Sequence, residues 1–155
     1  SNQGHDFTVS VGGTKVDPLP TPTSITYTSA TEAVVVTALS ADLTMTRTYT
    51  LFDRGMITQF SFCATNTAAT NVEFWQGTRD DYIGSTDEPQ KQTGSVATGD
   101  FVASDPGMAL LVSSADEGVV FSGSDPRSTG IISTVWGWSN IETKTTSSTA
   151  DYTGD

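Results

Sequence analysis

Four carboxylates lie close together in one polar stretch of the chain, and their type and spacing suggest metal chemistry. They are Asp80, Asp81, Asp87 and Glu88. Hard cations such as Ca²⁺ prefer carboxylate and carbonyl oxygens, which loops supply readily. The spacing matches no EF-hand, and a solvated polar loop is the commoner outcome for such a run. The segment is therefore a candidate Ca²⁺ site, with a solvated loop as the alternative.

The same carboxylates are the candidates for acid–base catalysis of glycoside hydrolysis. That reaction needs two carboxyls facing each other across a cleft, and a cluster on one loop supports it weakly. Nucleophilic catalysis with a histidine base would have to use His5, the only histidine, which lies in the polar N-terminal stretch. Zinc or copper would need several His or Cys ligands, and the chain has one of each. The sequence therefore predicts no catalytic residue and no cofactor other than Ca²⁺.

Exposed indoles are the other candidate ligand groups, because an indole offers a broad apolar face and a polar N–H to a sugar ring. Trp136 and Trp138 are two residues apart and so share one face of a strand, where a core or a domain interface is the commoner outcome. Trp75 alternates with Phe74 and is predicted to face outward beside the acidic loop. The residues of this candidate glycan site are Trp75, Gln76, Arg79, Trp136 and Trp138.

The charge balance narrows the class of partner. Eighteen acidic and seven basic residues give a net charge of −11, which repels nucleic-acid phosphates and anionic lipid. No apolar run approaches the length of a membrane span, so direct membrane insertion is not expected. The single cysteine, Cys63, excludes an internal disulfide and lies in an apolar run, so we expect it to be buried and inert.

The elements that must position these residues are strands. Residues 43–51 (LTMTRTYTL) carry threonine at every second position from Thr44 to Thr50, with mostly larger side chains between them. Such a strict period of two predicts a β-strand with unlike faces. Asp53, Arg54 and Gly55 then predict a hairpin turn in which Gly55 supplies a positive φ.

Further strands are expected along the rest of the chain, and no helix is. The first covers residues 6–11 and ends at Gly12 and Gly13, which predict a turn. The others are residues 24–28, 32–39, 57–64, 72–76, 100–103, 108–113, 118–122 and 131–138. Residues 77–98 show little regular pattern and are predicted to be a long loop of the functional kind. About nine to ten short strands predict an all-β, antiparallel two-sheet β-sandwich of the jelly-roll or immunoglobulin-like type.

The two ends of the sequence indicate a piece of something larger. The chain opens with Ser1, becomes polar after Asn140, and stops at Gly154 and Asp155, a dipeptide typical of the inside of a turn. We expect residues 1–155 to be a single sandwich domain that is a module of a longer chain.

Three stretches carry a family resemblance. SFCATNTAATNV (residues 61–72) precedes FWQGTRDDYIGSTDEPQKQTGSV (residues 74–96), and ADEGVVFSGSDPRS (residues 115–128) follows. Over about residues 49–127 the chain resembles β-sandwich modules that recur in large secreted, cell-surface or virion-associated proteins. The resemblance implies a structural or adhesive module, no catalytic residues to carry over, and a closing strand beyond Asp155.

The sequence thus predicts a non-catalytic module on a secreted protein, cell surface or virion surface, serving assembly, adhesion or glycan recognition. Its expected partners are neighbouring domains or subunits and glycans. One alternative is a carbohydrate-active enzyme domain using the loop carboxylates, which a deep groove with two facing carboxyls would favour. Another is a Ca²⁺-stiffened linker module of an adhesin, which further copies in flanking sequence would favour.

Overall fold

The computed structural model describes residues 5–65, 71–78, 90–97, 100–102, 108–112, 118–122 and 151–152, and every regular element in these ranges is a β-strand. The chain divides into two compact units. One unit is Val9–Glu73, and the other combines Ser1–Thr8 with Phe74–Asp155. The expectation of a single domain over residues 1–155 stays a prediction.

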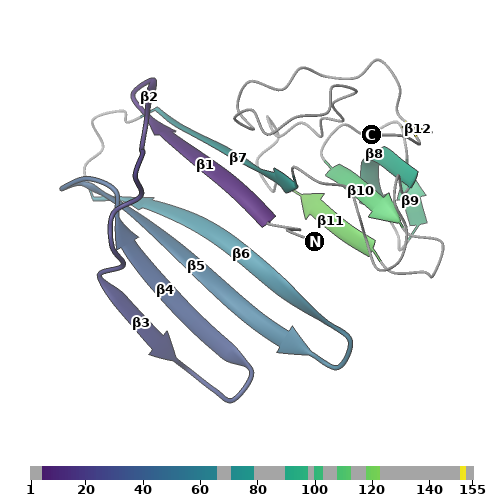
Figure 1. Cartoon of the computed structure of the whole chain (residues 1–155), viewed down its shortest axis with the longest axis horizontal. Coiled ribbons are helices and arrows are strands. Elements are labelled where there is room, and N and C mark those ends of the chain that lie inside the picture. Colours follow the sequence, from purple (N-terminus) through teal and green to yellow (C-terminus); the bar gives the residue numbers. More distant parts are fainter. Residues whose placement is uncertain are drawn as a thin grey trace. The chain divides into compact units, whose positions relative to one another are not determined.

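The strands follow one another with short connections in the first half of the chain (Figure 1). In chain order they are β1 (His5–Val11), β2 (Thr14–Lys15), β3 (Ser24–Tyr27), β4 (Glu32–Ala38), β5 (Leu43–Phe52), β6 (Gly55–Ala64), β7 (Val72–Thr78), β8 (Gln90–Ala97), β9 (Asp100–Val102), β10 (Met108–Val112), β11 (Gly118–Ser122) and β12 (Asp151–Tyr152).

A four-stranded antiparallel sheet in the order β3-β4-β5-β6 forms most of the unit Val9–Glu73. The predicted alternation in β5 is confirmed, because Leu43 and Met45 are 2% and 0% exposed, while Thr44 between them and Thr46 after Met45 are half-buried. We call the face of this sheet that carries Leu43 and Met45 the inner face, and the face that carries Thr44 and Thr46 the outer face. Alternation along each strand therefore assigns every residue of the sheet to one face.

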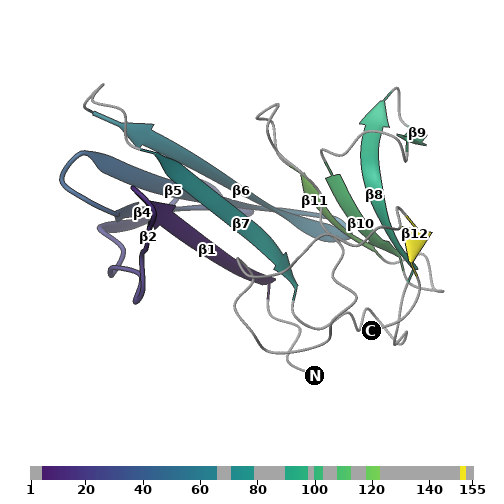
Figure 2. The ribbon, with the colours of Figure 1, turned by 90° about the horizontal axis from the view of Figure 1, so that it is seen from above.

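A three-stranded sheet in the order β2-β1-β7 is the second sheet of the described first half. Figures 1 and 2 both show β1 and β7 side by side and running in opposite directions. The predicted turn at Gly12 and Gly13 is confirmed: their φ angles are 60° and 79°, and the turn joins β1 to β2. Positive φ at both central residues is the type I′ pattern that glycine favours. The Gly12 N–H also donates to the Asn71 carbonyl at 2.8 Å.

The buried core of the unit Val9–Glu73 receives side chains from both sheets. Val9 of β1 is buried, as are Val35 and Thr37 of β4 and Leu43 and Met45 of β5. An all-β fold whose antiparallel sheets each bury one face is the architecture of a β-sandwich. The predicted fold class is confirmed.

The second unit contains a sheet in the order β11-β10-β8-β12, with β9 pairing to β8. Its strand β8 corrects the sequence prediction, because residues 90–97 lie within the stretch expected to be an unpatterned loop. β8 is mostly polar, but it pairs with the apolar strand β10, as in the Leu110–Gln92 pair. Its strand conformation therefore depends on neighbours on both sides rather than on hydrophobic alternation of its own. The predicted strand 131–138 lies outside the described residues.

Candidate functional site

Most residues of the two sites predicted from the sequence lie outside the described part of the chain. These are Arg79, Asp80, Asp81, Asp87, Glu88, Trp136 and Trp138. The Ca²⁺ site and most of the glycan site therefore stay predictions. Among the residues that the structure does describe, no group of three or more His, Cys, Asp or Glu side chains is placed to hold a metal ion.

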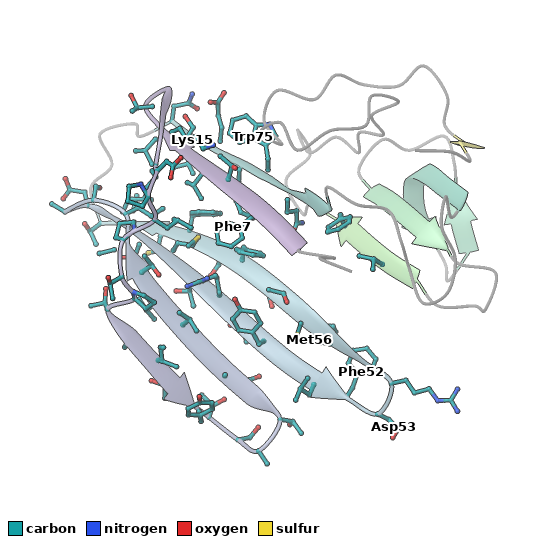
Figure 3. All side chains as sticks on the ribbon, in the orientation of Figure 1. Phe7, Lys15, Phe52, Asp53, Met56 and Trp75 are labelled. Atoms are coloured by element: carbon teal, nitrogen blue, oxygen red, sulfur yellow. The ribbon has the colours of Figure 1, made fainter. Side chains whose placement is uncertain are left out.

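Trp75 and Gln76 are the two predicted site residues that the structure describes. Both lie on β7 and both are half-buried; Figure 3 labels Trp75 on this strand. Neighbouring residues of a strand point to opposite faces, so Trp75 and Gln76 belong to different faces of the three-stranded sheet. Phe74 shares a face with Gln76, and its ring lies 6.2 Å from that of Phe7, centroid to centroid. A ligand stacked on Trp75 would therefore not meet Gln76 on the same face.

The feature that sequence reasoning missed is an exposed apolar surface on the inner face of the four-stranded sheet. Tyr27 is 80% exposed, Ile25 59%, Met56 56% and Leu51 53%. All four lie on the same face as the buried Leu43 and Met45, because they share the register of that face. We call these four residues the open end of the inner face, and the region around Leu43 and Met45 its closed end.

The strand register brings the residues of the open end together. Leu51 of β5 is directly opposite Met56 of β6, and Tyr27 of β3 is opposite Ala33 of β4, which in turn is opposite Tyr49 of β5. Directly opposite residues have Cβ atoms about 5 Å apart, so their side chains touch or nearly touch. Tyr27, Leu51 and Met56 therefore lie near one another, with Ala33 and Tyr49 between them, rather than as scattered exposed residues.

The β3–β4 turn holds Tyr27 at this end of the sheet. The Thr28 and Ser29 N–H groups both donate to the Glu32 carbonyl, at 3.1 and 3.4 Å. The Thr31 N–H donates to the Ser29 hydroxyl at 3.1 Å. Local side-chain and main-chain bonds of this kind close a turn without help from the rest of the chain. The position of Tyr27 is thus fixed locally, although its ring is exposed.

The β5–β6 hairpin turn is correct as predicted, but the reason given for Gly55 is wrong. Phe52 pairs with Gly55 across Asp53 and Arg54, yet Gly55 does not adopt a positive φ. A Cβ atom there would lie 2.7 Å from the Cζ atom of the Phe52 ring. Gly55 therefore makes room for an aromatic ring lying over the strand end. Figure 3 shows Phe52, Asp53 and Met56 together at this hairpin.

The expectation that Cys63 is buried is also wrong, because its side chain is exposed. Cys63 is opposite Thr44 and so lies on the outer face, next to the threonine row. The apolar composition of the segment suggested burial, but the apolar residues Phe60 and Phe62 are on the other face. The alternation of side chains along β6 already predicts that Cys63 lies on the face opposite that of Phe60 and Phe62.

The charges near the open end are few. Arg47 is half-buried on the inner face, two residues before Tyr49 along β5. Asp53 and Arg54 occupy the hairpin turn, where their charges offset each other. The open end is thus an apolar surface, and the interaction that it supports chemically is apolar contact. No helix in the described ranges is long and apolar enough to cross a membrane.

Comparison of the chain with protein-family models, with curated proteins and with solved structures finds no match.

Proposed function

We propose that this chain is a non-catalytic structural module that assembles with a neighbouring domain or subunit through the open end of its inner face. The observation that carries the proposal is the exposure of Tyr27, Ile25, Leu51 and Met56 on a face that is buried elsewhere. Contiguous exposed apolar surface on a soluble protein marks interaction sites, and tyrosine and methionine are enriched in protein interfaces.

The alternatives do not gain the same support. Trp75 and Gln76 lie on different faces of their sheet, so the described part of the candidate glycan site does not converge on one ligand. The carboxylates needed for glycoside hydrolysis or for Ca²⁺ lie outside the described residues. A surface location, on a secreted protein, cell or virion, is part of the proposal and is supported by composition and family resemblance alone.

Two methionines provide the test, since they lie on the same face of neighbouring strands and differ in exposure. Met45 is 0% exposed and Met56 is 56% exposed. Peroxide oxidises accessible methionine to the sulfoxide, which mass spectrometry detects. In the isolated chain we expect Met56 to oxidise at least about tenfold faster than Met45, because peroxide must reach the sulfur.

The decisive comparison is with the same chain in its native assembly. We expect the oxidation rate of Met56 to fall to near that of Met45, because a partner covers the open end. Equal oxidation of Met56 in the isolated chain and in the assembly would contradict the proposal. Met45 serves as the internal control, since its slow oxidation in both samples shows that the fold is intact.

A further inference from the structure

The connector between β2 and β3 is rich in proline and is held at both of its ends (Figure 1). Residues 16–23 read VDPLPTPT, and none of them belongs to a strand. At the start of the connector the Val16 N–H donates to the Val9 carbonyl at 2.9 Å. At its end the Thr23 N–H donates to the Val36 carbonyl at 2.7 Å. The residues between these two hydrogen bonds therefore span a fixed distance as a tethered segment.

The prolines at 18, 20 and 22 dictate the conformation of this segment. Proline fixes its own φ at about −65° and pushes the residue before it away from the helical region. Leu19 and Thr21 each precede a proline, so both favour the extended polyproline II conformation. Proline also lacks an N–H group, so such a segment is a poor strand in a sheet. The main chain around Thr21 is thus extended without belonging to a sheet.

Thr21 lies in the middle of this segment, between Pro20 and Pro22. Its side chain is exposed, and among the described residues its hydroxyl has no hydrogen-bond partner. Leu19 and Pro20 before it are also exposed, while Pro22 after it is half-buried. The Thr21 hydroxyl is therefore accessible together with the main chain on either side of it.

The other exposed threonines of the described ranges differ from Thr21 in one of two ways. Thr14 and Thr26 lie in β2 and β3, so their main chains pair with a neighbouring strand. The remainder have side-chain hydroxyls that already take part in hydrogen bonds of turns and strand ends; they are Thr23, Thr28, Thr31 and Thr65. Within the described part of the chain, Thr21 is the exposed threonine that combines an extended main chain outside any sheet with a hydroxyl that is not engaged.

We propose that Thr21 is an O-glycosylation site, an inference that rests on the surface location included in the proposed function. Threonine and serine interspersed with proline are the composition of O-glycosylated stalks. The reaction needs a glycosyltransferase that binds an extended peptide and a nucleoside diphosphate sugar as donor. The bond from the sugar's anomeric carbon to the diphosphate breaks, and the nucleoside diphosphate leaves with the electron pair. The Thr21 Oγ1 atom bonds to that carbon, and its proton passes to a base of the enzyme.

The surroundings of Thr21 can accept a bulky sugar. Because the side chain is exposed and its hydroxyl has no partner among the described residues, glycosylation breaks no hydrogen bond of the fold. An exposed stretch of main chain outside the sheets is also where proteolytic cleavage concentrates. A bulky, hydrated sugar in the middle of residues 17–22 shields this stretch.

The native protein, purified from the cells that produce it, provides the first test. Trypsin cleaves after Lys15 and Arg47, and the peptide 16–47 between them contains no other lysine or arginine before Arg47. Electron-transfer fragmentation of this peptide in a mass spectrometer assigns a sugar to an individual residue. We expect the mass of at least one hexose or N-acetylhexosamine on Thr21. An unmodified peptide, or a sugar confined to other residues of it, would overturn the assignment.

Three variants expressed in the same cells sharpen the test. Thr21→Val keeps the branched shape, removes the hydroxyl and should leave peptide 16–47 without sugar. Thr26→Val is the matched control, because Thr26 is exposed on β3, and it should leave the sugar unchanged. Pro22→Ala keeps Thr21 but frees its main chain, so glycosylation should fall at least about threefold. A Thr21→Val chain that keeps the sugar, or full glycosylation of Pro22→Ala, would contradict the inference.

The oxidation of Met56 separates this inference from the proposed function. If Met56 is protected in the native assembly while peptide 16–47 carries no sugar, the assembly function stands and the site at Thr21 is wrong. If Thr21 carries a sugar while Met56 oxidises as fast in the assembly as in the isolated chain, the glycosylation site stands and the assembly surface is wrong.

Discussion

The closed and open ends of the inner face belong to the same sheet and the same strands, yet their surroundings are opposite. At the closed end Leu43 and Met45 are fully buried, whereas at the open end Leu51 and Met56 are about half exposed. Residue type does not separate the two ends, since each has a leucine on β5 and a methionine nearby. The difference lies in what covers the face.

This contrast teaches that apolar side chains on one face of a strand need not all serve the core. β5 and β6 are ten residues each, while β1 and β7, the longer strands of the other sheet, are seven each. The apolar pattern of β5 continues past the buried residues to Leu51. A partner that covers the apolar residues beyond the core would explain why the pattern extends there. This is the basis of the proposed assembly surface.

The closed end is tested by Thr37, whose hydroxyl is buried there. Thr37 is 1% exposed, and its Oγ1 atom has no hydrogen-bond partner within the described part of the chain. A buried, unsatisfied hydroxyl costs about 1–3 kcal/mol, so the isosteric Thr37→Val change should raise the free energy of unfolding by about 1 kcal/mol. Urea denaturation measures this difference.

Thr48→Val is the matched control, because Thr48 is half-buried on the outer face and its hydroxyl can reach water. We expect a change within about 0.5 kcal/mol for this variant. A loss of stability in Thr37→Val would mean that the hydroxyl has a polar partner and that the closed end is not a dry core.

The hairpin at the open end is tested by Gly55→Ala, for which a smaller effect is expected. The new Cβ would lie 2.7 Å from the Phe52 ring. Phe52 is itself more than half exposed, so its ring can swing into water, and the loss should be below about 1 kcal/mol. In a Phe52→Ala background the same change should instead stabilise the strand by about 0.5 kcal/mol, because alanine has less backbone freedom than glycine. Equal effects in both backgrounds would show that the ring does not occupy this position.

Local patterns predicted the strands well, and pairing explains the exceptions. The alternation of β5 and the Gly12–Gly13 turn are properties of a few adjacent residues, and both were predicted from the sequence. β8 was not, because a polar strand gains its conformation from its neighbours. Gly55 was assigned the wrong role, because the Phe52 ring that excludes a side chain is visible only in three dimensions.

The candidate site, too, was predictable only where local sequence carries the information. The sequence directed attention to carboxylates and tryptophans because their side chains carry recognisable chemistry. The open end consists of ordinary apolar residues, and the sequence pattern of Leu51 is the same as that of Leu43. Exposure is the only property that distinguishes them, and exposure depends on how far the second layer extends over the sheet.

The most direct measurement compares Leu43→Ala with Leu51→Ala by urea denaturation of the isolated chain. The two leucines lie on one face of one strand, so the change in β-propensity is the same and cancels in the comparison. Leu43→Ala should lower the free energy of unfolding by about 2–5 kcal/mol, and Leu51→Ala by less than about 1 kcal/mol. Losses of equal size would mean that Leu51 belongs to the core, and the open end would then not be a surface for a partner.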